Sequence, residues 1–284
     1  MTPFSRRSFL AGAAASLTVP SLLSACGDSV SPAAKIELIR FNADGYFAPG
    51  SQRLPIGLAD AKGAVITAGP TTLTGRVLDA TGKVMSKDIV AQRRGEGMPR
   101  PFWPFVMSVA APGQYQLQIE TSSGKSAIFF TVSEPSKIPA PKPGDQLRFV
   151  DTATIANDRG VKPICTRNPF CPFHSVSLKD AQALHKPIAF LVSTPAHCTF
   201  AVCGPVLDFL IEEQKRFGDK LVAIHAEVYK DEGGTEPVDT METYGLTFEP
   251  CLFLADATGK VVERYDVLFD QKELGASLDK LVTG

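Results

Sequence analysis

The sequence has little cysteine for its length and no excess of either charge. Six cysteines in 284 residues are too few for a small scaffold held mainly by disulfides. Lys and Arg total 29 while Asp and Glu total 30, so no positive field favours nucleic acid, and we expect no nucleic-acid partner. Apolar residues make up 44% of the chain, which is enough for a buried core and excludes general disorder.

The N-terminal residues predict export followed by lipid anchoring. Residues 5–10 (SRRSFL) open a short run rich in Ala and Ser, and they resemble a bacterial twin-arginine export signal. Residues 23–26 (LSAC) resemble a lipobox, in which Cys26 receives the lipid and becomes the first residue. We therefore expect a signal peptide over 1–25 and a lipidated tether over 26–34. The alternative is an N-terminal membrane anchor that stays attached.

These motifs also predict where the protein is located. Acyl chains on Cys26 would hold the protein on a membrane of the bacterial cell envelope, on the periplasmic or cell-surface side. Disulfides persist in that oxidising environment. Beyond the signal, no stretch approaches about 20 unbroken apolar residues, which excludes a further spanning helix.

Residues 35–133 predict an all-β immunoglobulin-like sandwich. Short runs of alternating apolar residues are separated by Gly and Pro turns, and no long helical period occurs. The segment 112–117 (PGQYQL) resembles a late strand of immunoglobulin-like domains. The cluster 99–105 (PRPFWPF) holds the only Trp and is expected to plug one end of the sandwich; the alternative is an exposed recognition patch. We expect strands at 35–41, 53–59, 72–78, 104–110, 114–120 and 126–132.

The chain changes character after this module. Residues 134–147 contain four prolines and predict a semi-rigid linker. Residues 148–284 then alternate strand and helix patterns, which predicts an α/β domain. We expect strands at 187–192, 221–228, 251–255 and 261–265, and helices at 205–217 and 271–282.

These last residues resemble the thioredoxin superfamily in four pieces that follow in the family's order. An apolar strand ends in Cys198, which opens a helix, and Pro205 lies one turn further on inside that apolar helix. A second strand follows, and residues 244–250 (YGLTFEP) then run into a strand, a hairpin and a helix. The resemblance implies a thioredoxin-like fold. It also implies a cis Glu249–Pro250 bond, with Pro250 facing the redox cysteines.

Three positions depart from the family pattern. The cysteine pair is Cys-x4-Cys rather than Cys-x2-Cys, and His197 replaces the Trp that often precedes the first cysteine. Val192 stands where the family often has a buried acidic residue. We expect Glu249 to replace that acid as proton acceptor.

The chemistry of the pair follows from thiol ionisation. A cysteine where a strand gives way to a helix meets unpaired N–H groups that favour the thiolate, and a protonated His197 would favour it further. Cys198 is therefore the expected nucleophile and Cys203 the resolving thiol. Five residues of regular helix would aim the two side chains apart, so a Cys198–Cys203 bridge requires an irregular turn. The alternative is a purely structural disulfide.

The other cysteines lie nearby in the sequence. Cys165 and Cys171 flank a turn-rich loop and are expected to form a local disulfide; the alternative is metal ligation by Cys171 and His174 together with a thiol elsewhere. Cys251 is the odd thiol, either a buried apolar residue or a third redox or metal ligand. We expect His185 and His225 to be structural.

Together these features predict a lipid-anchored thiol–disulfide oxidoreductase that needs no cofactor and no metal. Its partners would be thiols and disulfides of exported proteins. One alternative is a copper(I) carrier using Cys198, Cys203 and either a His or Cys251. Another is a non-catalytic surface module. A peroxidase is disfavoured because Thr194 and Pro195 stand at the wrong spacing before Cys198.

Overall fold

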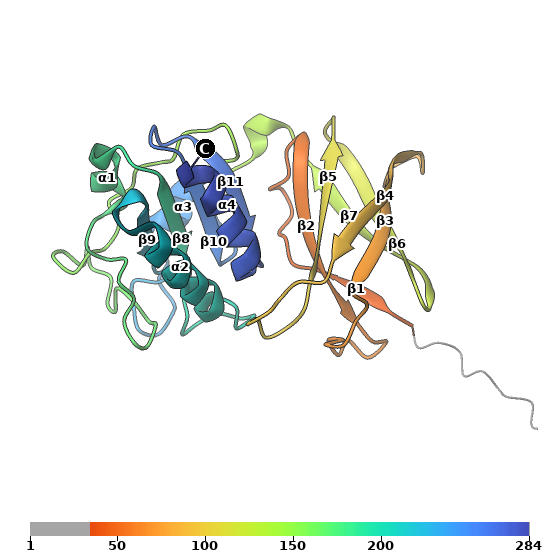
Figure 1. Cartoon of the computed structure of the whole chain (residues 1–284), viewed down its shortest axis with the longest axis horizontal. Coiled ribbons are helices and arrows are strands. Elements are labelled where there is room, and N and C mark those ends of the chain that lie inside the picture. The colour runs from red at the N-terminus through yellow and green to blue at the C-terminus, as the bar shows by residue number, and fades with distance from the viewer. Residues whose placement is uncertain (1–34, 284) are drawn as a thin grey trace, which may run out of the picture. The chain divides into compact units, whose positions relative to one another are not determined.

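The computed structural model describes residues 35–283 and is built mostly of β-strands (Figure 1). The strands are β1 (Glu37–Arg40), β2 (Gly50–Ala59), β3 (Thr72–Asp79), β4 (Val84–Gln92), β5 (Trp103–Val109), β6 (Gly113–Thr121), β7 (Gly124–Val132), β8 (Ile188–Val192), β9 (Val222–Ala226), β10 (Cys251–Ala255) and β11 (Val261–Asp266). The helices are α1 (Leu178–Ala181), α2 (Cys203–Phe217), α3 (Asp239–Tyr244) and α4 (Gln271–Thr283), with single 3-10 turns at Pro135–Lys137, Gln182–Leu184 and Gly218–Lys220.

The predicted signal peptide and the lipidation of Cys26 lie outside the described residues. Within residues 35–283, none of the helices combines the length and the apolar composition needed to cross a membrane.

The first half is an all-β sandwich, as predicted. Its sheets have the strand orders β1-β2-β5 and β4-β3-β6-β7, and every pairing is antiparallel. Side chains alternate between the shared core and solvent, most clearly along β5. One core joins the two sheets and includes Leu54, Ile56, Phe105 and Leu117, all fully buried.

The aromatic residues of the cluster near residue 100 are buried. Phe102, Trp103 and Phe105 are fully buried, and the Trp103 indole N–H donates to the carbonyl of Pro70 at 3.1 Å. The interpretation as an exposed recognition patch is therefore wrong.

One strand was not predicted. β4 lies at the edge of its sheet, and Ala91 is its only buried residue. Polar residues such as Lys87 and Asp88 interrupt its apolar pattern, so the segment lacks the alternation that marks a half-buried strand.

The second half holds one sheet of order β11-β10-β8-β9. β8 pairs parallel with β9, whereas β10 pairs antiparallel with both β8 and β11. Every residue of β8 and β10 is buried, because helices and loops cover both faces of these central strands. The predicted alternation of strands and helices is confirmed in its order.

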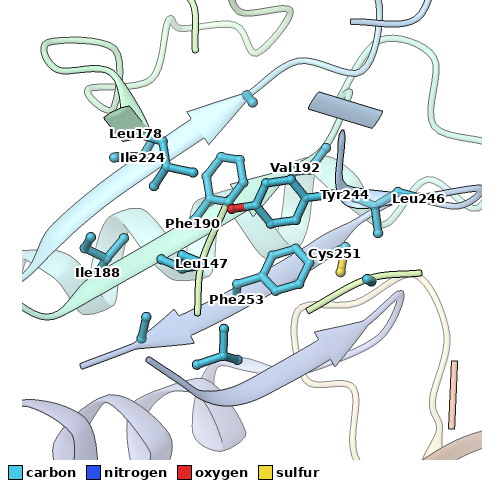
Figure 2. Close-up of a cluster of buried hydrophobic side chains, with 14 of the residues drawn as sticks. Leu147, Leu178, Ile188, Phe190, Val192, Ile224, Tyr244, Leu246, Cys251 and Phe253 are labelled. Atoms are coloured by element: carbon cyan, nitrogen blue, oxygen red, sulfur yellow. The ribbon is translucent and has the colours of Figure 1, made fainter. Parts of the chain in front are cut away.

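Alternate residues of the central strands enter two different cores. On one face, Phe190 and Phe253 pack with Tyr244 at the end of α3 and with Leu178 of α1 (Figure 2). On the other face, Leu191, Leu252 and Leu254 pack against the apolar sides of α2 and α4. The period of two along a strand thus anchors helices on both sides of the sheet.

The proline-rich segment 134–147 is more than a spacer. Ala140 and Leu147 are buried in the same core as Phe190, and the Leu147 N–H donates to the Gly259 carbonyl at 2.8 Å. The expectation of a semi-rigid linker overlooked the apolar residues between the prolines, whose burial stabilises the packed segment.

Further contacts link the sandwich half to the helices of the second half. The Tyr46 hydroxyl donates to the Gly245 carbonyl at 2.5 Å. Arg53 and Glu273 form a two-pronged ion pair at 3.0 and 2.8 Å, with both side chains largely buried. A bidentate pair of this kind fixes geometry as well as contributing energy.

Candidate functional site

The loop between β8 and α2 carries the predicted redox pair. β8 ends at Val192, a turn-rich segment contains Cys198, and α2 begins only at Cys203. The prediction that the helix opens at Cys198 is therefore wrong by five residues. Pro205 is tolerated in the first turn of α2 because its missing N–H would have no helical acceptor there.

This irregular loop brings the two thiols together. The sulfur atoms of Cys198 and Cys203 and a carboxylate oxygen of Glu249 all lie within 4.8 Å of one another. The Cys203 backbone N–H donates to the Cys198 sulfur at 3.2 Å. Cys203 is fully buried, whereas Cys198 is partly exposed. The segment between the two cysteines is irregular, as a Cys198–Cys203 bridge would require.

The surroundings shift the pKa values of the two thiols in opposite directions. The pKa of Cys198 is lowered to about 6, first by the hydrogen bond with the Cys203 side chain and then by the backbone N–H groups of Cys203, Val202 and Phe200, while burial opposes the shift. The pKa of Cys203 is raised, first by burial and then by the neighbouring Cys198 thiolate. At neutral pH, Cys198 is thus the thiolate and the more accessible sulfur.

Glu249 faces the buried thiol. The Cys203 S–H donates to Glu249 Oε2 at 3.9 Å, a long contact of the kind sulfur makes. The pKa of Glu249 is raised to about 7, first by burial and then by the negative charge at Cys198. The Glu249–Pro250 peptide bond leading into β10 is cis, which confirms the expectation from the resemblance.

His197 is placed differently from the expectation. Its ring packs edge-on against Tyr229, with centroids 5.6 Å apart. The groups that lower the pKa of Cys198 are the Cys203 side chain and the backbone N–H groups of Phe200, Val202 and Cys203. Val192, at the position of the family's buried acid, is fully buried in β8.

Residues from the first half border the site, which the sequence did not indicate. Cys198 packs beside an apolar cluster that contains Phe41 and Phe102. Phe200 is 38% exposed, meets the Phe41 ring edge-on at 6.1 Å and lies under the Arg100 guanidinium. Phe41 directly follows β1 and Phe102 directly precedes β5, so the sequence suggested only that they belong to the sandwich core, and no local signal pointed to this neighbourhood.

A second cluster of sulfur and nitrogen lies elsewhere in the second half. Cys165, Cys171, His174 and His225 are all buried, and their side-chain ligand atoms lie within 4.8 Å of one another. Cys165 and Cys171 are present as thiols, and their predicted disulfide stays a prediction. His225 was expected to be merely structural; its position as the one imidazole inside the apolar strand β9 was the available signal.

Cys251 belongs to neither group. It is fully buried at the start of β10, and its S–H donates to Asp266 Oδ1 at 3.6 Å. Burial raises the pKa of this thiol well above its ordinary value. Cys251 therefore behaves as an inert, packed residue rather than as a third redox ligand.

Comparisons with known proteins add little to this description. No family model matches the chain, and no curated protein matches it. Among solved structures, the chain is similar to the solution structure of the PKD domain from the human VPS10 domain-containing receptor SorCS2, with 14% sequence identity. That match covers 44% of this chain and 98% of the other, with a TM-score of 0.20, too low to carry an argument.

Proposed function

We propose that the protein is a thiol–disulfide oxidoreductase that acts through Cys198 and Cys203. The observation that carries the proposal is the pairing of a partly exposed sulfur, which accepts an N–H bond from the first residue of α2, with a buried thiol beside it. Low-pKa, accessible cysteines next to a second thiol are the arrangement that exchange chemistry requires.

The reaction has two steps. The Cys198 thiolate attacks one sulfur of a substrate disulfide, forms a mixed disulfide and expels the other sulfur as a thiolate. Cys203 then loses its proton and attacks the Cys198 sulfur, which expels the second substrate thiolate and leaves a Cys198–Cys203 disulfide. The substrate gains the two electrons that the protein loses, and a dithiol of another protein resets the pair.

Glu249 supplies the proton acceptor in the second step. Its carboxylate is the hydrogen-bond partner of the Cys203 thiol, and a pKa near neutrality suits a group that must accept and return a proton. Once Cys198 has formed the mixed disulfide, it no longer carries a negative charge. Its contribution to the raised pKa of Glu249 is then lost, whereas the contribution of burial remains.

The architecture agrees with this activity. We propose that the second half is a thioredoxin-like domain, supported by the order β8, α2, β9, α3, β10, β11, α4 and by the cis Glu249–Pro250 bond beside the thiols. For the first half we propose an immunoglobulin-like sandwich. Its support is Tyr115, whose hydroxyl donates to the Ala111 carbonyl at 2.9 Å, four residues upstream.

The substrates we propose are disulfides or thiols of exported proteins. The apolar surroundings of Cys198 and the partly exposed Phe200 ring suit a polypeptide segment better than a small charged thiol. A lipid on Cys26 would hold this activity at the bacterial cell envelope.

A copper(I) carrier is the weaker alternative. The third potential ligand beside Cys198 and Cys203 is the Glu249 carboxylate, a hard ligand that suits copper(I) poorly. Cys251, the other candidate ligand, donates a hydrogen bond to Asp266 and does not belong to the Cys198–Cys203 group.

Trapping tests the proposal directly. The full-length Cys203→Ser variant, mixed with a peptide disulfide, should accumulate a mixed disulfide at Cys198. Cys198→Ser should form none, and the matched control Cys251→Ser should turn over like the parent chain. Absence of both trapping and turnover contradicts the proposal. Stoichiometric copper(I) bound by the reduced protein and lost in Cys198→Ser would establish the carrier instead.

A further inference from the structure

We infer that Cys165, Cys171, His174 and His225 form a binding site for one tetrahedral zinc ion, separate from the redox pair. These residues hold two sulfur and two nitrogen ligand atoms within 4.8 Å of one another. All four side chains are buried, at 6%, 0%, 1% and 0% exposure respectively. Two thiolates and two imidazoles are a ligand set typical of structural zinc.

The spacing of these atoms fits the ion. With Zn–S bonds of about 2.3 Å and Zn–N bonds of about 2.0 Å, tetrahedral angles place a sulfur and a nitrogen about 3.5 Å apart and two nitrogens about 3.3 Å apart. Cys171 Sγ lies 3.5 Å from His225 Nδ1, and His174 Nε2 lies 3.2 Å from the same nitrogen. These two distances are already close to the edge lengths of a zinc coordination tetrahedron.

The tautomer of His225 is fixed by a neighbouring carbonyl. Its Nε2 lies 3.0 Å from the Ser193 carbonyl oxygen and 3.1 Å from the Ser193 hydroxyl. The carbonyl can only accept, so Nε2 carries the proton and the lone pair of Nδ1 faces the cluster. Ligating histidines in zinc sites are oriented in this way by a backbone carbonyl on the other ring nitrogen.

Charge balance favours a metal in this position. Two buried thiolates would be costly by themselves, whereas two thiolates, two neutral imidazoles and Zn²⁺ form a neutral group. A Cys165–Cys171 disulfide would use the sulfurs alone. It would leave the two imidazoles, 3.2 Å apart between their facing nitrogens, without a chemical role.

The segment that carries most of the ligands has no regular secondary structure to hold it in place. Residues 138–177 contain no helix or strand, an unusual length of irregular backbone within a packed protein. Three of the four ligands lie in this segment, and the fourth lies on β9. A zinc ion would therefore join the irregular segment to the sheet.

The segment that zinc would hold in place also contacts the loop that carries Cys198. Thr166, next to Cys165, accepts the Ala196 N–H on its hydroxyl at 3.1 Å. The same Thr166 donates its backbone N–H and its hydroxyl to buried Glu227, at 2.6 and 2.8 Å. Zinc would thus stabilise the loop that carries Cys198 through Thr166, without contacting the sulfur atoms of Cys198 and Cys203.

Metal content tests the inference on the full-length exported chain, purified through a tag without histidine and without chelators. We expect about one zinc per chain by elemental mass spectrometry. His174→Ala should lose nearly all of it, whereas the exposed His185→Ala and the Cys198→Ser/Cys203→Ser double variant should keep it. Zinc that disappears with Cys198 and Cys203, or a zinc-free parent chain, overturns the inference.

A second measurement on the parent chain covers the case in which His174→Ala does not fold. Peptide mapping after thiol labelling should find Cys165 and Cys171 protected while zinc is bound. Both should become labelled in step with zinc removal by a strong chelator. A Cys165–Cys171 disulfide in the exported chain, or labelling that is independent of zinc, contradicts the site. Neither result bears on trapping at Cys198, so the two proposals fail separately.

Discussion

The backbone N–H of Cys203 points at the sulfur of Cys198, 3.2 Å away, although four residues lie between the two cysteines in the sequence. This contact gives Cys198 the benefit of a helix N-terminus without placing it in the helix. The turn between them leaves Cys198 partly exposed, while Cys203 starts α2 from a buried position. One thiol is therefore an accessible anion and the other a protected acid.

The first prediction concerns the pH dependence of alkylation at Cys198. A pKa of about 6 makes the thiol about 90% ionised at pH 7, against about 3% for an ordinary cysteine, because the thiolate dominates above the pKa. The rate of alkylation at Cys198 should rise through pH 6 and level off by pH 7.5, as followed by mass spectrometry of the Cys198 peptide.

Cys203→Ala provides the control for this profile. It removes the side-chain hydrogen bond, the largest cause of the lowered pKa, but keeps the backbone N–H. The midpoint should therefore move upward without reaching the ordinary value of about 8.5. An identical profile in Cys203→Ala would show that the buried thiol does not stabilise the Cys198 thiolate.

The second prediction concerns Glu249 in the resolving step. Glu249→Gln removes the carboxylate that accepts the Cys203 proton and nearly preserves its volume. The mixed disulfide at Cys198 should then resolve about 100-fold more slowly, at the lower end of what a positioned base contributes. Stopped-flow release of the second substrate thiol measures the rate.

The pH profile of the same step separates a base from a merely polar neighbour. In the parent chain, the resolving rate should rise as the Glu249 carboxyl ionises, and in Glu249→Gln that limb should disappear. The first step, attack by Cys198, should keep its own profile in both proteins. If Glu249→Gln slows attack and resolution equally, Glu249 acts on Cys198 rather than as the base for Cys203.

Much of this fold follows from sequence periodicity. The runs at 188–192 and 251–255 are almost wholly apolar, because both faces of these central strands are covered, and that is a strong local signal. β4 gave no such signal, because only one of its nine residues is buried. The start of α2 was misplaced because residues 199–202 (TFAV) carry no breaker.

The two cysteine groups differ in how far the sequence reveals them. Cys198 and Cys203 are close in sequence, and Glu249 was expected beside them because the resemblance implies that its neighbour Pro250 faces the redox cysteines. His225 lies 51 residues beyond His174, and its approach depends on how an irregular segment packs on β9. No local periodicity encodes that contact, so the sequence suggested only the Cys171 and His174 part of the cluster.

A third prediction follows from the raised pKa of Glu249. A carboxyl whose pKa is about 7 in the folded protein and about 4.5 unfolded binds more protons when folded, so stability falls as pH rises from 4.5 to 7. Glu249→Gln should stabilise the protein by about 1 kcal/mol at pH 8, since partial solvation moderates the effect, and by almost nothing at pH 4. Urea unfolding at the two pH values measures the difference; equal effects at both would contradict it.

The fourth prediction concerns the buried ion pair of Arg264 and Asp266. Both side chains are about nine-tenths or more buried, and Arg264 also donates to the carbonyls of Tyr46 and Pro141 at 2.9 and 3.1 Å. Arg264→Met should cost about 3–5 kcal/mol in urea unfolding, because it leaves a buried carboxylate without its partner. Arg159→Met, which breaks a more exposed pair with Asp151, should cost less than about 1 kcal/mol.

The double variant Arg264→Met/Asp266→Leu separates two causes of that loss. If the unpaired carboxylate is responsible, replacing both charges with apolar side chains should recover most of the stability. If the hydrogen bonds from Arg264 to Tyr46 and Pro141 matter more, the double variant should stay as unstable as Arg264→Met. Those two bonds tie β11 to the sandwich residue Tyr46 and to the proline-rich segment, so persistent instability would identify Arg264 as the side chain that holds these parts of the chain together.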